Sequence, residues 1–237
     1  MQEKPIKSPP IRTREPEREG HRERLRQRFE KGGVDAVGDH ELLELILFRA
    51  IQRLDVKVIA HQLLNHFKDL SAVMSAPEAE LLSFDGVGKA AVLEFRVIRA
   101  AALRFGQATV LNRPVLAGWD DLIVYCRTKM AEEKIEGFHV LFLDKKNRVI
   151  ADEQMGSGTV DHTPVYPREV IKRALALDAT ALIITHNHPS GDPSPSRADI
   201  EMTMKLRDLA AGFNIVLHDH LVVARGEVLS FKEKGLL

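Results

Sequence analysis

The stretch that decides the fold of this chain is ALIITHNHPSGDPSPSRADIEMTMKLRDLAAG, residues 181–212. Its first five residues are apolar or β-branched and predict a short buried strand that ends at a pair of histidines. A loop rich in proline follows, and residues 196–212 then predict a helix that Gly212 stops. A strand followed by a helix in this way is typical of a sheet whose faces are covered by helices.

The sequence on both sides of this stretch continues the alternation of strands and helices. Three more strands are expected, at residues 138–144, 148–155 and 214–224. Two more helices are expected, at residues 119–131 and 166–177. The turn residues KKN join the first two of these strands and predict a β-hairpin. Residues 118–237 are therefore expected to form one α/β (α+β) domain in which helices cover a sheet.

The first half of the chain predicts helices alone. Four are expected, at residues 41–51, 56–67, 75–84 and 88–105. Gly106 is expected to stop the last of them, so residues 21–106 are expected to form a helical domain. Residues 107–117 have no helical period, contain Pro114 and predict a linker. Residues 1–20 carry prolines among mixed charges and predict a disordered tail.

The composition restricts the class of protein. Of 237 residues, 34 are Lys or Arg and 34 are Asp or Glu, so no overall basic field indicates nucleic acid. A single cysteine, Cys126, excludes an internal disulfide and suits a reducing cytosol. No apolar run approaches the roughly 18 residues that span a bilayer, and the charged N-terminus lacks an apolar signal region. We therefore expect a cytoplasmic protein with no membrane partner.

The histidines at the end of the predicted strand indicate a metal site. His186 and His188 are alternate residues, and alternate residues of an extended chain point to the same side. Asp199 follows at the start of the predicted helix, after a loop that its prolines stiffen. Two imidazoles and one carboxylate suit Zn²⁺, and a fourth position left to water is typical of a catalytic zinc site.

The same residues also have a purely structural explanation. Ser196 is a suitable N-cap for the helix that follows it, and Asp199 would then stand near the third helical position as its capping partner. The two histidines would be loop residues whose ring nitrogens bond to the backbone. The spacing favours the metal site and leaves both explanations open.

A zinc hydrolase also needs a general base beside the attacking water. The candidates are Asp152 and Glu153, in the second strand of the predicted hairpin. Since strand faces alternate, only one of the two can point to the metal. If that strand neighbours residues 181–185, Glu153 could face the metal; otherwise it is a solvent-facing strand residue. The residues alone do not choose between the two carboxylates.

The spacing of H-x-H, seven residues, Ser, two residues and Asp resembles the signature of the JAMM (MPN-plus) metalloprotease family. The surrounding residues 158–210 resemble the bacterial RadC family, and that resemblance extends from Gly20 to Leu237. It implies a mixed sheet flanked by helices, and the zinc-dependent hydrolysis of a peptide or isopeptide bond. The implied partner is a protein or peptide substrate.

The resemblance also implies a role for each matching residue. His186, His188 and Asp199 are the implied zinc ligands. Glu153 is the implied general base, which takes a proton from the attacking water and returns it to the leaving amine. Ser196 is implied to help hold the negative oxygen of the tetrahedral intermediate, where one lost donor typically costs on the order of a hundredfold in rate.

Two further histidines, His218 and His220, repeat the H-x-H spacing in the strand expected at residues 214–224. Asp219 between them points to the other side, so a second metal site there lacks a third ligand. We expect both to pack at a strand edge, or one of them to orient a zinc ligand through a hydrogen bond.

One motif in the helical domain indicates a different function. FDGVGKAAVLEF, residues 84–95, resembles the hairpin of helix-hairpin-helix DNA-binding modules. In such a hairpin, Gly86 and Gly88 would let backbone N–H groups approach a phosphate at a helix N-terminus, and Lys89 would add charge. A tight turn used for protein contacts explains the same residues. The alternative function is therefore a DNA-associated module in repair or genome maintenance, with no peptidase activity.

Overall fold

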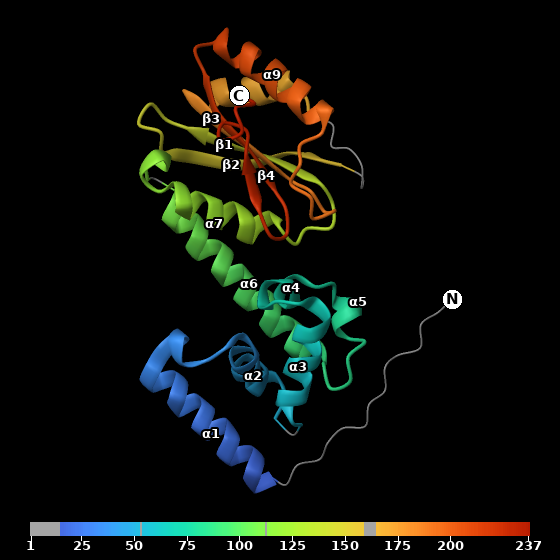
Figure 1. Cartoon of the computed structure of the whole chain (residues 1–237). Coiled ribbons are helices and arrows are strands. Elements are labelled where there is room, and N and C mark those ends of the chain that lie inside the picture. Colours follow the sequence, from blue (N-terminus) through green and yellow to red (C-terminus); the bar gives the residue numbers. More distant parts are fainter. Residues whose placement is uncertain (1–14, 53, 112, 159–164) are drawn as a thin grey trace, which may run out of the picture. The chain divides into compact units, whose positions relative to one another are not determined.

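The structure is a computed structural model that describes residues 15–52, 54–111, 113–158 and 165–237 (Figure 1). The chain forms two compact units, Met1–Ala101 and Ala102–Leu237. The boundary between them lies within one long helix, α6 (Lys89–Val110). Each unit has a hydrophobic core of its own.

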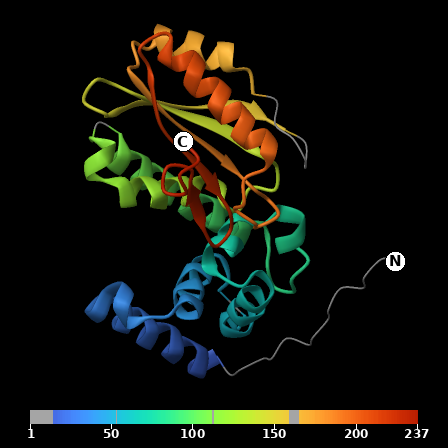
Figure 2. The same ribbon diagram turned by 45° about the horizontal axis from the view of Figure 1, so that its top comes forward.

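The first unit is built from helices, as the sequence predicts (Figures 1 and 2). They are α1 (Glu15–Gly32), α2 (Asp39–Ala50), α3 (Val56–Phe67), α4 (Leu70–Ser75), α5 (Glu78–Leu81) and the first part of α6, with a short 3₁₀ helix η1 at Gly33–Ala36. Asp55 and Asp69 cap α3 and α4, because their side chains accept hydrogen bonds from backbone N–H groups of the first turn. The fully buried side chains of the core include Leu43, Leu47, Leu63, Leu81 and Phe95.

Helix α6 does not end where the sequence predicts. It continues through Gly106 to Val110, so residues 107–110 of the expected linker are helical. Gly106 lies against Tyr125: a β-carbon at this position would be 3.3 Å from Cδ2 of the tyrosine ring. Val110 is buried in the core of the second unit. Glycine inside a helix destabilises the helix by roughly 1 kcal/mol relative to alanine. The contacts of Gly106 and Val110 with the second unit outweigh this cost.

Helix α1 also differs from expectation, since it begins at Glu15. The prediction of a disordered tail is therefore wrong for residues 15–20, and its remainder, residues 1–14, lies outside the described residues. The helix is held by burial of Leu25 in the first core. A hydrogen bond also joins α1 to α2: His21 Nε2 lies 2.6 Å from the buried carboxylate of Glu44.

The second unit contains a mixed sheet of five strands. In spatial order they are β2 (Val149–Ser157), β1 (Gly137–Leu143), β3 (Ala181–Asn187), β4 (Val216–Val223) and β5 (Val228–Ser230). The β3–β4 pair is parallel and the other pairs are antiparallel. The β1–β2 hairpin and the strands at β3 and β4 confirm the prediction. β5 has three residues, too few for a periodic pattern, and no sequence signal predicts it.

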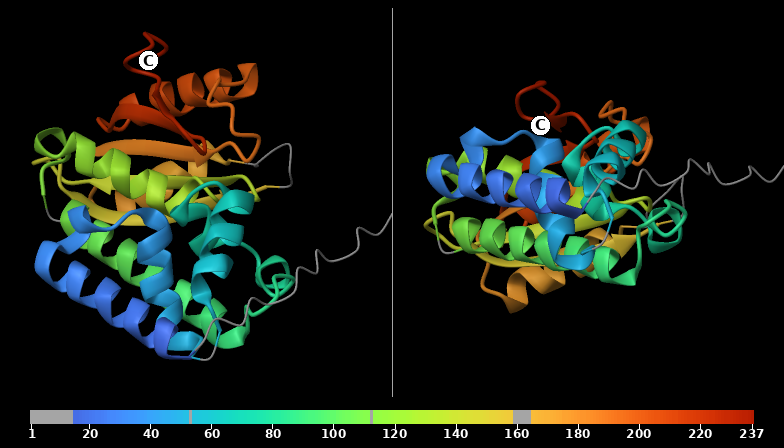
Figure 3. Two further views of the ribbon diagram at one scale, coloured as in Figure 1. Left: turned by 60° about the horizontal axis from the view of Figure 1, so that its bottom comes forward. Right: turned by 90° about the horizontal axis from the view of Figure 1, so that it is seen from below.

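Helices cover both faces of this sheet (Figures 2 and 3). α7 (Trp119–Met130), which follows the 3₁₀ helix η2 (Val115–Ala117), covers one face, and α8 (Pro167–Ala176) and α9 (Arg197–Ala211) cover the other. β3 is buried along its whole length: Ile183 packs on the α7 side and Ile184 on the α8–α9 side. None of the helices in the described ranges has both the length and the apolar character that crossing a membrane requires.

The α7 side of the sheet holds a buried charged cluster around Asp152 of β2. Its carboxylate accepts hydrogen bonds from Tyr125 Oη (2.5 Å) and Lys129 Nζ (2.8 Å), both on α7. Burial alone would raise the pKa of Asp152, but the neighbouring His139 and the hydrogen bonds from Lys129 outweigh it and lower the pKa to about 2. Asp152 therefore ties α7 to the sheet and, as expected from the alternation of strand faces, points away from α8 and α9.

The glycine turn of the first unit lies between α5 and α6. Gly86 has a φ of +84°, which L side chains rarely adopt, and a β-carbon there would lie 2.8 Å from Ile59 Cδ1. Gly88 and Lys89 are exposed, and Lys89 is the first residue of α6. Gly86 thus has a packing role of its own, whereas Gly88 and Lys89 lie at an accessible helix N-terminus.

Substitution of Gly86 tests this packing role. Gly86→Ser should lower the free energy of unfolding by about 1–2 kcal/mol, since serine is strained at positive φ and its β-carbon would meet Ile59. Gly88→Ser is the matched control: no described residue lies within 4 Å of its β-carbon position, and serine is a favourable N-cap. Urea unfolding followed by circular dichroism measures both variants. Equal losses in the two would contradict the assignment.

Candidate metal centre

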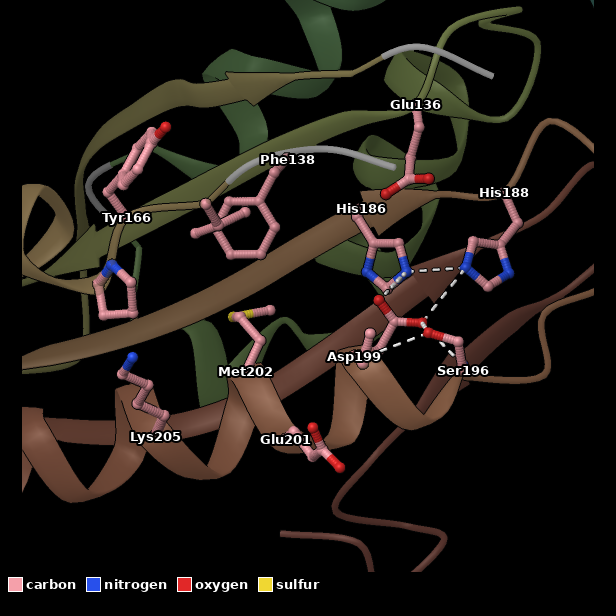
Figure 4. Close-up of a pocket in the computed structure, with 13 residues that line it drawn as sticks. Glu136, Phe138, Tyr166, His186, His188, Ser196, Asp199, Glu201, Met202 and Lys205 are labelled. Atoms are coloured by element: carbon pink, nitrogen blue, oxygen red, sulfur yellow. Dashed lines mark hydrogen bonds and ion pairs between the residues drawn. The ribbon is translucent and has the colours of Figure 1, made fainter. Parts of the chain in front are cut away.

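Strand β3 and helix α9 bring three predicted metal ligands together (Figure 4). His186 lies near the end of β3, and His188 follows the strand, where its backbone N–H still donates to the Val223 carbonyl of β4 (2.9 Å). Asp199 lies in the first turn of α9. The Nε2 atoms of the two histidines are 2.9 Å apart, and Asp199 oxygens lie 3.6 Å from His186 Nε2 and 3.7 Å from His188 Nε2.

Ser196 determines where the Asp199 carboxylate points. As the N-cap of α9, its Oγ accepts from the Asp199 backbone N–H (3.1 Å) and donates to Asp199 Oδ2 (2.6 Å). The Ser196 backbone N–H donates to the same oxygen (2.7 Å). Burial alone would raise the pKa of Asp199, but the neighbouring His188 and the hydrogen bonds from Ser196 lower it well below its usual range. Capping and metal binding are therefore not alternatives, because the capping box orients the carboxylate toward the histidines.

The partner of His188 decides which of its ring nitrogens carries the proton. His188 Nδ1 lies 2.7 Å from the carbonyl oxygen of Asp192, which the turn at Gly191 (φ +86°) brings back toward the ring. A carbonyl oxygen only accepts, so Nδ1 is the donor. In the neutral ring, Nε2 then presents its lone pair to the cluster.

The tautomer of His186 follows from a buried relay of hydrogen bonds. Thr203 Oγ1 donates to the Asp199 carbonyl (2.6 Å), which uses its only proton, so it must accept from His220 Nδ1 (2.6 Å). His220 Nε2 in turn must accept from His186 Nδ1 (2.7 Å). His186 Nε2 therefore carries a lone pair that points to the cluster. His220 thus has the orienting role that the sequence allowed for one histidine of its pair, and His218 instead contacts Asn147 Oδ1 (2.7 Å).

This donor set fits Zn²⁺. Two ring lone pairs 2.9 Å apart repel each other unless a proton or a cation lies between them. Burial lowers the pKa of His186 to about 4, so His186 stays neutral near pH 7. The nearby Asp199 carboxylate raises the pKa of His188, so a proton on His188 can take the place of a cation. Two neutral imidazoles and a carboxylate are ligand types that hold zinc with a fourth position open.

Glu136 is a member of the site that the sequence did not reveal. It directly precedes β1 and lines the same pocket as the three ligands, and its carboxylate is turned toward His186 (Figure 4). Phe138 of β1 is paired with His186, so the antiparallel register places Glu136 opposite His188 on the same face. Only the pairing register would have identified Glu136, because it stands just before the strand that the apolar pattern predicts.

Glu153 lies on the same face of the sheet as His186 but is separated from β3 by β1, and it does not line the pocket that contains the cluster. Strand β1 lies between β2 and β3, and Glu153 of β2 is paired with Val140 of β1. Its carboxylate instead accepts hydrogen bonds from Arg173 of α8, from Nε at 2.8 Å and from Nη2 at 2.5 Å. These bonds lower the pKa of Glu153. The prediction depended on β2 neighbouring β3, and the strand order is different.

Replacement of Thr203 tests the relay. Thr203→Val keeps the shape of the side chain but removes the donor to Asp199 and the acceptor for His220, so His186 is no longer held in one tautomer. We expect zinc affinity to fall about 10–100-fold, measured by competition with a chromophoric chelator. Thr185→Val is the matched control, since Thr185 is equally buried but contacts Met130 on the other face. Equal affinities for the two variants would refute the relay.

The two units of the chain match two protein families. Residues 116–236 match the RadC-like JAB domain, and residues 18–93 match the UPF0758 N-terminal domain. A UPF0758 protein of Rhodobacter capsulatus is 56% identical over 213 residues, which cover 90% of this chain and 100% of the relative. A UPF0758 protein of Ruegeria pomeroyi is 50% identical over 217 residues, which cover 92% of this chain and 97% of the relative. The chain therefore belongs to the UPF0758 proteins, a family with a RadC-like JAB domain.

Proposed function

We propose that this chain is a zinc-dependent hydrolase that cleaves a peptide or isopeptide bond. The observation that supports it best is the convergence of His186 Nε2, His188 Nε2 and the Asp199 carboxylate in one pocket with Glu136. Membership of a family with a JAB domain is compatible with this chemistry. Capping alone would explain Ser196 and Asp199, but it would not explain two ring nitrogens that face each other.

Three side chains would hold the metal, through His186 Nε2, His188 Nε2 and an Asp199 oxygen. When bound, zinc supplies Lewis-acid chemistry: it makes water a stronger nucleophile near neutral pH and polarises the carbonyl group of a substrate. The buried bond from His186 to His220 prevents the His186 ring from turning. A partner of this kind fixes the tautomer and the ring orientation of a metal-ligating histidine.

Glu136 is the general base in this proposal, in place of Glu153. Its carboxylate is on the pocket side of the ligands, where it can accept a proton from the attacking water and return it to the leaving amine. The carboxylate of Glu153 is occupied by the guanidinium of Arg173. Glu136 directly precedes β1, the strand next to β3, and extension of the β1–β3 register puts it opposite His188.

In the proposed site, Ser196 orients a zinc ligand in addition to the role that the sequence predicts. Its hydroxyl proton is donated to Asp199 Oδ2, so its first task in the proposed site is to orient that ligand. The expected role of holding a negatively charged oxygen requires the proton to turn from Asp199 toward the substrate. Ser196 lines the pocket, so the hydroxyl is within the site where this exchange would take place.

Matched glutamine substitutions test the assignment of the base. Glu136→Gln should lower the rate of peptide or isopeptide hydrolysis about 10²–10⁴-fold and leave zinc at about one per chain, because it removes a proton acceptor but no expected ligand. Glu153→Gln should retain activity, since Glu153 pairs with Arg173. Hydrolysis is followed by mass spectrometry of peptide products and zinc by elemental analysis. Activity lost in Glu153→Gln and retained in Glu136→Gln would overturn the assignment.

A second candidate function is the binding of DNA through the first unit. The observation that favours it is the accessible N-terminus of α6, a helix of 22 residues, with Gly88 and Lys89 exposed there. Free N–H groups and the helix dipole at such an end favour a phosphate. The neighbouring Asp85 is also exposed, and its negative charge opposes an anion at this place.

A charge reversal in the full chain tests the DNA candidate. Lys89→Glu should weaken binding to duplex DNA and reduce the salt dependence of the binding constant by roughly one phosphate contact. Lys31→Glu, at the end of α1, makes the same change in charge away from the turn. Fluorescence anisotropy at several salt concentrations measures both variants. Binding that does not respond to salt, or that responds equally to both substitutions, would exclude a phosphate site at Lys89.

A further inference from the structure

The pocket that contains the metal cluster extends well beyond it. Its volume is about 720 Å³, within the range of pockets that enclose a ligand. Glu136, His188 and Ser196 lie at one end, and Tyr166 and Lys205 lie toward the other (Figure 4). A bond held for cleavage at the metal end therefore leaves the far end to recognise neighbouring groups of the substrate.

One side of this pocket is a stripe of helix α9. Ala198, Met202 and Lys205 are spaced four and three residues apart, so they lie on one face of the helix, beside the buried stripe that carries Thr203. Lys205 stands six residues after Asp199, which is about 9 Å along the helix axis at 1.5 Å per residue. An extended peptide covers this distance in about three residues.

The middle of the pocket is apolar. Its side chains come from β1, from the segment that enters α8, and from α9: Phe138, Val165, Tyr166, Pro167 and Met202. Figure 4 shows Met202 rising from α9 toward Phe138. Tyr166 is 63% exposed, so part of this apolar surface is open to solvent and available to an apolar side chain of a substrate.

Lys205 supplies a single positive charge at the far end. Its side chain rises on the pocket side of α9 (Figure 4), and it forms no hydrogen bond or ion pair with the residues that the structure describes. Glu201, four residues earlier, is bonded instead to Arg197 (2.7 Å), and its carboxylate turns away from the pocket. No group among the described residues therefore competes with a substrate anion for the Lys205 ammonium group.

From this arrangement we infer that the substrate is a polypeptide segment with an apolar residue near the scissile bond and an Asp or Glu about three residues from it. The inference rests on the proposed hydrolase function of the same site. The apolar side chain packs among Phe138, Met202 and Tyr166, and the acidic side chain pairs with Lys205. Lys205 is exposed, so the partner is an acidic side chain of a continuing chain rather than a terminal carboxylate in a closed pocket.

A binding selection tests this recognition without requiring cleavage. Random peptides displayed on phage are selected on the zinc-loaded, full-length Glu136→Gln variant, and recovered peptides should share an apolar residue followed or preceded by an acidic one at the stated spacing. In a second variant that adds Lys205→Glu, the affinity for the best peptide should fall about fivefold or more. The same peptide with Lys in place of its acidic residue should recover binding.

Arg207→Glu is the matched control, because it reverses a charge on the same helix outside the pocket and should not change the selected motif. A selection without acidic enrichment, or an equal loss in the Lys205 and Arg207 variants, overturns the inference. Cleavage of the selected peptides by the wild-type protein is measured separately. Peptides that bind through Lys205 but are not cleaved count against the hydrolase, whereas cleavage that ignores the acidic residue counts against this inference alone.

Discussion

A carbonyl oxygen can only accept a hydrogen bond, and at the candidate metal centre this constraint decides the state of the groups around it. The Asp199 carbonyl takes the hydroxyl proton of Thr203, so Thr203 accepts from His220, and His220 accepts from His186. The lone pair of His186 Nε2 is then left to face His188 and the Asp199 carboxylate. A ligand in β3 and a ligand in α9 are thereby joined through buried bonds. The arrangement of the candidate ligands therefore depends on the packing of α9 against the sheet.

The order of the strands has an equally direct effect on the chemistry. Parallel pairing of β3 with β4 sets Ile184 beside His220, which puts His220 diagonally next to His186 on the same face. Antiparallel pairing of β3 with β1 sets Glu136 opposite His188. β2 is separated from β3 by β1. Two adjacent carboxylates of β2 bind helices on opposite faces of the sheet: Asp152 contacts α7 and Glu153 contacts α8.

Three adjacent parts of the surface of helix α9 make different contacts. Its N-cap box orients Asp199, its buried stripe carries Thr203 and Leu206 into the sheet, and its third stripe lines the pocket as far as Lys205. Because a helix is rigid over this length, the distance along α9 between the candidate ligand Asp199 and Lys205 is set by the helical rise. In the proposed function, the bond to be cleaved and the acidic side chain of the substrate would therefore lie at a fixed spacing.

The sequence by itself determined the helical first half, the β1–β2 hairpin, the β3–loop–α9 unit and the candidate ligands His186, His188 and Asp199. These depend on local periodicity and on spacing within about 14 residues, which the chain carries in its order of residues. The end of α6, the strand β5 and the position of Glu136 beside the candidate ligands depended on contacts between distant segments. Pairing of β1 with β3 brings together residues about 50 positions apart, and no local pattern encodes which strands are neighbours. Only the tertiary structure could therefore place Glu136 at the site and His220 behind His186.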